Sequence, residues 1–444
     1  MTTMSGAKAA SGMPETAAHD ADARRTVAGA EASVWTERML SALGNGVKGG
    51  KWFSLMDKVF APKTLALAWA KVRANKGVAG VDGQSIKRFA VRQDEYLAEL
   101  SMALREGSYS PQAVRRVDIP KGDGKTRPLG IPTVKDRIVQ TAVRLVVEPI
   151  FEHGFAEGSY GFRPGRGCHD ALRVVDGLIK EGFTHVVDAD LQAYFDTIPH
   201  DALMAQVEAN VIDGGVLELI RGWLKADILK GTASWTPTGG TPQGSVISPL
   251  LANIYLDPLD KLMAALGFRM VRYADDFVIL CRTREDADAS LAEIRAWVTA
   301  NGLTLHPTKT HVGDCRVPGQ GFEFLGYRFE AGRRFVRKKS MNKLKNKIRE
   351  KTGRCRGVSL EQVIADLNPV LRGWFGYFKQ AHPTTFADVD GFIRRRLRSM
   401  LLKQKKKRHI GFGTLIHKTW PNAYFANLGL FALKAAWDTA RQSR

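Results

Sequence analysis

The stretch Arg269-Met270-Val271-Arg272-Tyr273-Ala274-Asp275-Asp276-Phe277-Val278-Ile279-Leu280 decides the fold. Apolar, β-branched and aromatic residues flank a short polar step, a pattern that predicts a strand, a sharp turn and a second strand. An Asp-Asp pair is most often a solvated turn, because Asp favours turns and is readily hydrated. These two acids instead stand between apolar strands, so we expect Asp275 and Asp276 at the tip of a hairpin.

A second group of acids follows an apolar strand earlier in the chain, in Val186-Val187-Asp188-Ala189-Asp190-Leu191. Nucleotidyl transfer needs two divalent cations, one to activate the attacking 3′ hydroxyl and one to neutralise the leaving pyrophosphate. Carboxylates from two separate strands supply such a site, and we expect Asp190 to be the ligand from this strand. Oxygen ligands shared with substrate phosphates favour Mg²⁺, with Mn²⁺ as the alternative ion.

The charge of the chain points to a polyanionic partner. Its 66 Lys and Arg exceed its 45 Asp and Glu, which gives a formal net charge of +21 over 444 residues. Nucleic acid suits that excess better than a membrane, since no apolar run approaches the roughly 20 residues that span a bilayer. The N-terminus lacks the apolar stretch of a signal peptide. The four dispersed cysteines form no metal or disulfide pattern, so we interpret them as packing residues in a reducing cytoplasm.

The length allows two or three domains, and shifts in composition suggest where they begin. Residues 1–45 are rich in Ala, Gly, Ser and Thr and are expected to form a disordered tail. Apolar residues at helical spacing begin at Trp52, so residues 46–115 are expected to form a helical N-terminal extension. Residues 116–335 mix short strand-like and helical runs, which predicts an α+β domain.

The C-terminal third concentrates basic residues. Residues 333–356 form a helix-compatible stretch with twelve Lys or Arg against one acid, and residues 394–408 hold nine and no acid. Between them lies the aromatic run Leu371–Lys379, and rings with nearby cations can bind bases and phosphates. A solvated helix face with buried aromatics is the alternative for either basic run alone. Finding both runs favours RNA binding, for which the candidates are Lys338, Lys339, Lys343, Lys347, Arg372, Arg394, Arg395, Lys405, Lys406 and Lys407.

These motifs resemble the reverse transcriptases, and more narrowly those encoded by group II introns, which also act as maturases. The segment Asp190–Asp196 is similar to the palm motif of that family, and Tyr273–Asp276 matches its Tyr-Ala-Asp-Asp box. The resemblance implies that Asp190, Asp275 and Asp276 form the catalytic triad and that Asp188 and Asp196 are structural. It also implies that Phe195 excludes a ribose 2′ hydroxyl.

Two blocks resemble the family's nucleotide-binding segments. Lys125–Pro132 is similar to the fingers segment, which implies that Arg127, helped by Lys125, holds the incoming triphosphate. Gly240–Leu250 is similar to the block that begins a palm helix, which implies that Gln243 lies beside the bound nucleotide and the primer terminus.

Two more blocks resemble segments near the template and the leaving group. Gly161–Leu172 is similar to the family's next block, in which Arg163 and Arg166 could contact template phosphate. Gly302–Thr310 resembles the palm block with a lysine near the pyrophosphate, which implies charge neutralisation or proton donation by Lys309. A solvated surface lysine is the alternative.

The resemblance extends to the C-terminal third. Phe324–Tyr327 is similar to a hairpin that grips the primer, and Leu367–Phe378 is similar to the thumb or maturase domain. The expected architecture is a right-hand polymerase, with fingers and palm at 116–335, an all-α thumb and maturase domain at 336–410 and a basic, aromatic segment at 411–444. Because the chain ends soon after Arg408, we expect no His-Asn-His endonuclease.

Our leading hypothesis is an intron-encoded RNA-directed DNA polymerase that also binds its intron RNA to assist splicing and mobility. Its expected partners are an intron RNA template, a DNA or RNA primer and deoxynucleoside triphosphates, with the oligomeric state left open. One alternative is a domesticated reverse transcriptase in DNA repair or phage defence. Another is an RNA-binding splicing factor with little polymerase activity, which the full set of acids argues against.

Overall fold

The computed structural model describes residues 30–31, 34–47, 49–122, 124–355, 357–406 and 413–442, without the side chains of Lys121 and Lys125. Backbone contacts divide the chain into two compact units. The first comprises Met1–Gly177, Ala189–Leu280 and Asp288–Thr310, and the second comprises Leu178–Asp188, Cys281–Ala287 and His311–Arg444. No described helix is both long enough and apolar enough to cross a bilayer.

The predicted disordered tail is wrong in its last part and lies outside the described residues up to position 29. Helix α2 (Glu37–Asn45) falls within the predicted tail and is capped by the side chain of Thr36. Trp35 is buried, and its indole nitrogen donates to the carbonyl of Leu145 at 3.0 Å. A few buried apolar side chains therefore hold this segment, although its average composition is poor in them.

The predicted helical extension is present as α3 (Met56–Val59), α4 (Pro62–Ala74), α5 (Ile86–Val91) and α6 (Gln93–Glu106). Helix α4 begins at a proline, which suits the first helical turn, and α6 ends at a glycine in the left-handed conformation. The apolar side of α4 packs on α7 (Val134–Gly154), whose side chains are buried almost throughout. The long α7 is thus the core helix of the first unit.

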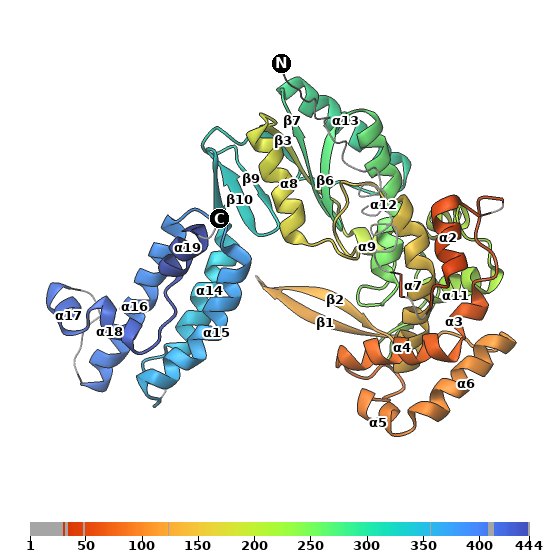
Figure 1. Cartoon of the computed structure of the whole chain (residues 1–444), viewed down its shortest axis with the longest axis horizontal. Coiled ribbons are helices and arrows are strands. Elements are labelled where there is room, and N and C mark those ends of the chain that lie inside the picture. The colour runs from red at the N-terminus through yellow and green to blue at the C-terminus, as the bar shows by residue number, and fades with distance from the viewer. Residues whose placement is uncertain are drawn as a thin grey trace, which may run out of the picture. The chain divides into compact units, whose positions relative to one another are not determined.

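A four-stranded sheet joins two segments that are far apart in sequence. Its order is β2-β1-β4-β5, built from β1 (Val114–Gly122), β2 (Lys125–Ile131), β4 (Ile228–Lys230) and β5 (Ala233–Trp235). Strands β1 and β2 form a long antiparallel ribbon (Figure 1) in which Ile119 pairs with Arg127. Strand β4 runs parallel to β1, with Val114 opposite Ile228.

The second sheet has the order β6-β7-β3-β8. It consists of β3 (His185–Asp190), β6 (Arg269–Tyr273), β7 (Asp276–Cys281) and β8 (His311–Asp314). The accompanying helices are α8 (Cys168–Lys180), α9 (Tyr194–Thr197), α10 (His200–Glu208), α11 (Gly214–Leu224), α12 (Ser248–Ala265) and α13 (Arg284–Ala300). After Asp276, every residue of β7 is buried. The predicted α+β class is confirmed.

The C-terminal part of the second unit is mainly helical. A small sheet of order β11-β10-β9 contains β9 (Phe322–Phe324), β10 (Tyr327–Glu330) and β11 (Arg333–Val336), and it includes the predicted hairpin at 324–327. The helices that follow are α14 (Lys338–Lys351), α15 (Leu360–Phe378), α16 (Thr384–Gln404), α17 (Thr414–Thr419), α18 (Asn422–Asn427) and α19 (Leu433–Gln442). The basic stretch at 333–356 is therefore not one helix, since its first residues pair with β10.

The aromatic residues of α15 pack inside this unit. The ring of Trp374 lies 5.0 Å from that of Phe378, and Phe375 lies 5.5 Å from Phe386. Arg372 is exposed and lies over the ring of Phe431. Trp374, Phe375 and Tyr377 are nevertheless partly exposed, so a role of this run in stacking nucleobases stays a prediction.

The four cysteines are free thiols. Burial of Cys281 and Cys315 agrees with a packing role, whereas Cys355 is exposed, so that interpretation is wrong there. Cys168 is half-buried, and its hydrogen bond to Tyr273 is the main reason why the pKa of that tyrosine rises to about 12.

Candidate active site

The predicted hairpin is confirmed, with its acids at the tip. Tyr273 and Asp276 are the last paired residues of β6 and β7, so Ala274 and Asp275 form the turn. Ala274 has a φ of +61°, a left-handed conformation that residues other than glycine rarely adopt. Such a turn has to be held by its surroundings.

Arg272 holds this turn from the inside of the protein. Its guanidinium is fully buried and pairs with the buried carboxylate of Asp260 on α12, with Nε and Oδ1 2.8 Å apart. The same guanidinium donates to the carbonyl of Ala274 at 2.9 Å and to Asn253 Oδ1 at 3.0 Å. Burial raises the pKa of Asp260, while the Arg272 charge opposes that shift. The pair links the turn at Ala274 and Asp275 to α12.

A loop before α8 closes against the same hairpin. Tyr160 N donates to Arg272 O at 2.9 Å, and Arg272 N donates to Gly158 O at 2.8 Å. A Cβ added to Gly161 would lie only 2.3 Å from the backbone nitrogen of Ala274. Glycine is therefore required where this loop passes the turn.

Arg163, in this loop, was predicted to contact template phosphate, and the structure contradicts that prediction. Its side chain is only 3% exposed and pairs with Glu152 at 2.8 Å. Nη1 also donates to the carbonyls of Ala156 and Ser159 at 2.7 and 2.8 Å. All these bonds lie within the protein, so Arg163 shapes the loop. Arg166 is partly exposed and pairs with the exposed Glu157 at 2.7 Å.

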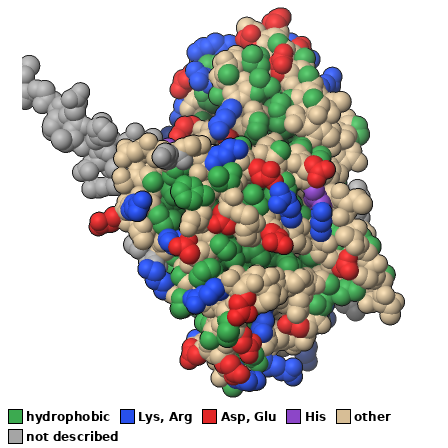
Figure 2. Space-filling model, turned by 90° about the vertical axis from the view of Figure 1, so that its right-hand side faces the viewer, with side chains coloured by type: hydrophobic (Ala, Val, Ile, Leu, Met, Phe, Trp, Pro, Cys, Tyr) green, Lys and Arg blue, Asp and Glu red, His purple; other side chains and the backbone are tan. Residues whose placement is uncertain are grey.

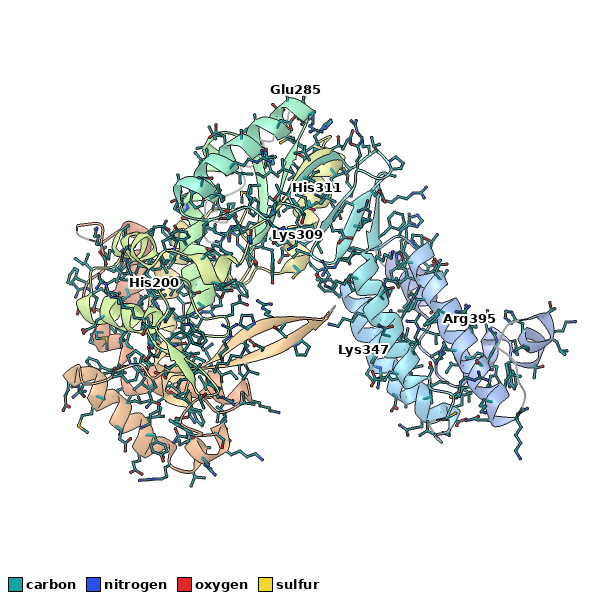
Figure 3. The ribbon with its side chains drawn as sticks, turned by 180° about the vertical axis from the view of Figure 1, so that it is seen from behind. His200, Glu285, Lys309, His311, Lys347 and Arg395 are labelled. Carbon is teal, nitrogen blue, oxygen red and sulfur yellow. The ribbon has the colours of Figure 1, made fainter. Side chains whose placement is uncertain are left out.

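Asp190 ends β3 beside the segment that carries Lys309. The carbonyl of Asp190 accepts a bond from His306 N at 2.7 Å, and the Lys309 ammonium pairs with the Asp190 carboxylate. Figure 3 shows Lys309 in the segment that follows α13. Asp190 thus already binds a cation, and the predicted role of Lys309 at the leaving pyrophosphate stays a prediction.

The segment after Asp190 packs on α12, the helix that also bonds to Arg272. Tyr194 is buried and donates to Ala252 O at 2.6 Å. Burial raises the pKa of Tyr194 well above its usual value, and the negative charge of Asp275 adds to that rise. Asn253, which follows Ala252 on α12, bonds to Arg272, so α12 connects the segment after β3 to the turn after β6, and β3 and β7 are neighbouring strands.

The three carboxylates form an oxygen-only donor set of the kind that Mg²⁺ or Mn²⁺ accepts. Asp190, Asp275 and Asp276 are all partly exposed. Among the described residues, however, no group of three His, Cys, Asp or Glu side chains is already gathered closely enough to hold a metal ion. The shared metal site therefore stays a prediction.

A pocket of about 800 Å³ opens beside α9 and contains two of the predicted nucleotide-binding residues, Phe195 and Gln243. Phe195 is 8% exposed, and its carbonyl accepts a bond from Thr241 N at 2.6 Å. A Cβ on Gly240 would lie 2.7 Å from the same carbonyl. The glycine thus allows the loop to approach α9 closely, which forms one wall of the pocket. The other walls include Val114, Arg116, Gly130, Asp196, Pro199, Trp235 and Gly302.

Arg127 is exposed beside this pocket and bonded to Gln243. Its Nε donates to Gln243 Oε1 at 2.7 Å, and Gln243 Nε2 donates to Asp196 Oδ2 at 3.3 Å. The structure therefore brings Arg127, Phe195 and Gln243 together, as the sequence predicts. The side chain of Lys125 lies outside the described structure.

Cations are exposed on the second unit. The exposed candidates are Lys338, Lys339, Lys343, Lys347, Arg372, Arg395, Lys405 and Lys406, while Arg394 is partly exposed and Lys407 lies outside the described residues. Figure 3 labels Lys347 on α14 and Arg395 on α16, two helices that pack together. On the face drawn in Figure 2, by contrast, Lys and Arg lie among Asp and Glu.

Arg272, Asp260 and Asn253 are functional candidates that the sequence reasoning missed. A charged residue inside the apolar strand β6 and an Asp on the buried side of α12 were the available signals. Charges are rarely buried unless they are paired, so a buried Arg272 and a buried Asp260 would each be expected to need a partner of opposite charge.

Comparisons with known proteins agree with these motifs. The model of the family described as reverse transcriptase (RNA-dependent DNA polymerase) matches residues 119–329, and that of the group II intron maturase-specific domain matches residues 341–420. Protein YkfC of Escherichia coli (strain K12) is 34% identical over 320 residues, covering 62% of this chain and 82% of that protein.

Another relative is larger than this chain. The group II intron-encoded protein LtrA of Lactococcus lactis is 37% identical over 214 residues, which cover 48% of this chain and 35% of LtrA. A solved partial Cas6-RT-Cas1–Cas2 complex covers 55% of this chain and 42% of its own, at 24% identity and a TM-score of 0.36. The chain belongs to the reverse transcriptases, the RNA-dependent DNA polymerases, of the group II intron type.

Proposed function

We propose that this chain copies RNA into DNA at Asp190, Asp275 and Asp276, using two Mg²⁺ ions held by these carboxylates. The observation that carries the proposal is that β3, which ends at Asp190, and β7, which begins at Asp276, are neighbouring strands of one sheet. When bound, the divalent ions would activate the primer 3′ hydroxyl and neutralise the leaving pyrophosphate.

The surrounding residues have distinct proposed roles. Arg127 binds the triphosphate, since it is exposed at the pocket. Phe195 forms the wall that excludes a 2′ hydroxyl, and Gln243 lies beside the nucleotide. The Lys309 ammonium, paired with Asp190 here, neutralises or protonates the departing pyrophosphate oxygen.

The second unit is proposed to bind RNA. Its exposed cations on α14 and α16 provide the charge that phosphates require. We propose that residues 336–410 serve as thumb and maturase domain, which binds the parent intron RNA and assists splicing and mobility. A primer and deoxynucleoside triphosphates are the remaining proposed partners, and a cytoplasmic location fits the free thiols.

The alternatives of a repair or defence enzyme and of a binding factor without polymerase activity are not favoured by the comparisons. Primer extension with purified protein tests the proposal. Wild type should extend a DNA primer on an RNA template with Mg²⁺, and Asp275→Ala with Asp276→Ala should abolish synthesis. The exposed Asp201→Ala is the matched control and should remain active. Synthesis by the doubly substituted protein would contradict the site assignment.

A further inference from the structure

Asp196 is an acid of the palm motif that has no part in the proposed metal site. It lies on α9, directly after Phe195, and lines the pocket. Its carboxylate accepts a hydrogen bond from Gln243 Nε2 at 3.3 Å. The sequence interpretation gave Asp196 only a structural role, yet its partner is a residue proposed to contact the nucleotide.

The Gln243 carboxamide is held between an acceptor and a donor. An ionised carboxylate only accepts hydrogen bonds, and the guanidinium Nε of Arg127 only donates them. Gln243 therefore presents Nε2 to Asp196 and Oε1 to Arg127, the latter at 2.7 Å. The opposite orientation would place two donors together at Arg127 and two acceptors together at Asp196.

The backbone around Gln243 is also held on both sides. Gly130 N donates to Gln243 O at 2.6 Å, which ties the loop to β2. Thr241 N donates to Phe195 O at 2.6 Å, which ties it to α9. With the backbone held, the orientation of the side-chain amide depends on the two groups that it bonds.

The terminal guanidinium nitrogens of Arg127 are available to bind a ligand. Among the described residues, Arg127 makes one side-chain hydrogen bond, from Nε to Gln243. The terminal guanidinium nitrogens, which form a fork suited to phosphate oxygens, are not used in that bond. The amide of Gln243 thus orients the guanidinium without blocking the phosphate-binding side.

We propose that Asp196 is a positioning residue for the incoming deoxynucleoside triphosphate: by fixing the amide of Gln243, it holds Arg127 in the orientation that binds the triphosphate. This inference rests on the proposed function, because it concerns the nucleotide of that reaction. Asp196 acts through Gln243 and does not touch the reacting atoms.

The ionisation of Asp196 gives the relay a pH dependence. Partial desolvation raises the pKa of its carboxyl group, while the bond from Gln243 and the charges of Arg116 and Arg127 oppose that rise. Protonation occupies a carboxylate oxygen with hydrogen, so the acceptor is weakened as pH falls through the raised pKa. The KM for the nucleotide should therefore rise towards acidic pH.

A double-mutant cycle in primer extension tests the proposal. Asp196→Ala and Gln243→Ala should each raise the KM for deoxynucleotides by about three- to tenfold, the effect of one lost hydrogen bond, with kcat nearly unchanged. Because both act through one relay, the double substitution should be no worse than Gln243→Ala alone. Asp196→Asn keeps an acceptor oxygen and should restore most of the affinity. The control, Asp201→Ala, should leave KM unchanged.

The pH profile provides a readout that a structural role would not change. The rise in KM at acidic pH should be smaller in Asp196→Asn than in wild type, since an amide does not titrate in this range. This comparison can be made even if Asp196→Ala fails to fold. The inference would be overturned if the fold increases in KM from the two Ala substitutions multiply in the double variant, or if kcat falls while KM is unchanged. A wild type that makes no DNA from an RNA template would instead overturn the proposed function and this inference with it.

Discussion

The guanidinium of Arg272 donates a hydrogen bond of 2.9 Å to the carbonyl oxygen of Ala274, in the turn that carries Asp275. The same group is neutralised by buried Asp260. A residue next to the Tyr-Ala-Asp-Asp box thus supports the box from inside the protein.

Breaking this pair should cost stability as well as activity. Arg272→Met leaves the Asp260 carboxylate buried and unpaired, which we expect to lower the free energy of unfolding by about 3–5 kcal/mol, measured by urea denaturation. Replacing both, Arg272→Met with Asp260→Leu, should recover much of the stability but not the primer extension, because the Ala274 carbonyl has lost its donor. The exposed Arg269→Met on the same strand is the control. Full activity of the stable double variant would refute the supporting role.

Gly161→Ala should disturb the catalytic turn. The added Cβ would meet the backbone nitrogen of Ala274 at 2.3 Å, and a backbone atom cannot move aside as a flexible side chain can. Primer extension should fall by at least about tenfold and thermal stability should drop. Gly177→Ala, on α8 with no atom within 4 Å of the added Cβ, should stabilise the protein by about 0.5–1 kcal/mol. Equal behaviour of the two variants would argue against a close approach at Gly161.

Phe195→Ala should relax sugar selection. Removing the Phe195 ring enlarges the pocket where a 2′ hydroxyl would otherwise clash with it. Discrimination between deoxynucleotides and ribonucleotides, measured as a ratio of kcat/KM values, should fall by about tenfold or more. Loss of both activities in parallel would mean that Phe195 supports the fold without selecting the sugar.

RNA binding should depend on salt through the second unit. For single-stranded RNA, log K falls with log salt, and each lost phosphate contact reduces the magnitude of that negative slope by about 0.7. Lys343→Gln with Lys347→Gln should therefore reduce the magnitude of the slope by about 1.4 in a filter-binding titration. Lys379→Gln with Lys418→Gln removes two exposed charges from the same unit and should leave the slope unchanged. Identical slopes for both variants would argue against a localised RNA surface on α14.

The local patterns predicted the hairpin at residues 269–280 and the helical extension, because spacing and turn chemistry act over short distances. The family resemblance, and not local spacing, implied that Arg127, Phe195 and Gln243 share one site. The local patterns could not predict the burial of Arg163, which depends on Glu152 and on two backbone carbonyls. The ordered segment around Trp35 was missed for the same reason, since the hydrogen-bond partner of Trp35 is Leu145, 110 residues away. Net charge likewise could not tell a phosphate-binding arginine from one that holds a loop.

In the proposed active site, Asp190 completes the set of metal-binding acids begun by Asp275 and Asp276. The direct test is single-turnover primer extension by Asp190→Asn on a pre-bound RNA template and DNA primer, with RNA affinity measured in parallel. We expect synthesis to fall by about a thousandfold or more, as loss of a metal-binding carboxylate implies, while the Kd for RNA stays within about twofold. Synthesis at the wild-type rate with unchanged RNA binding would contradict the assignment of Asp190 to the active site.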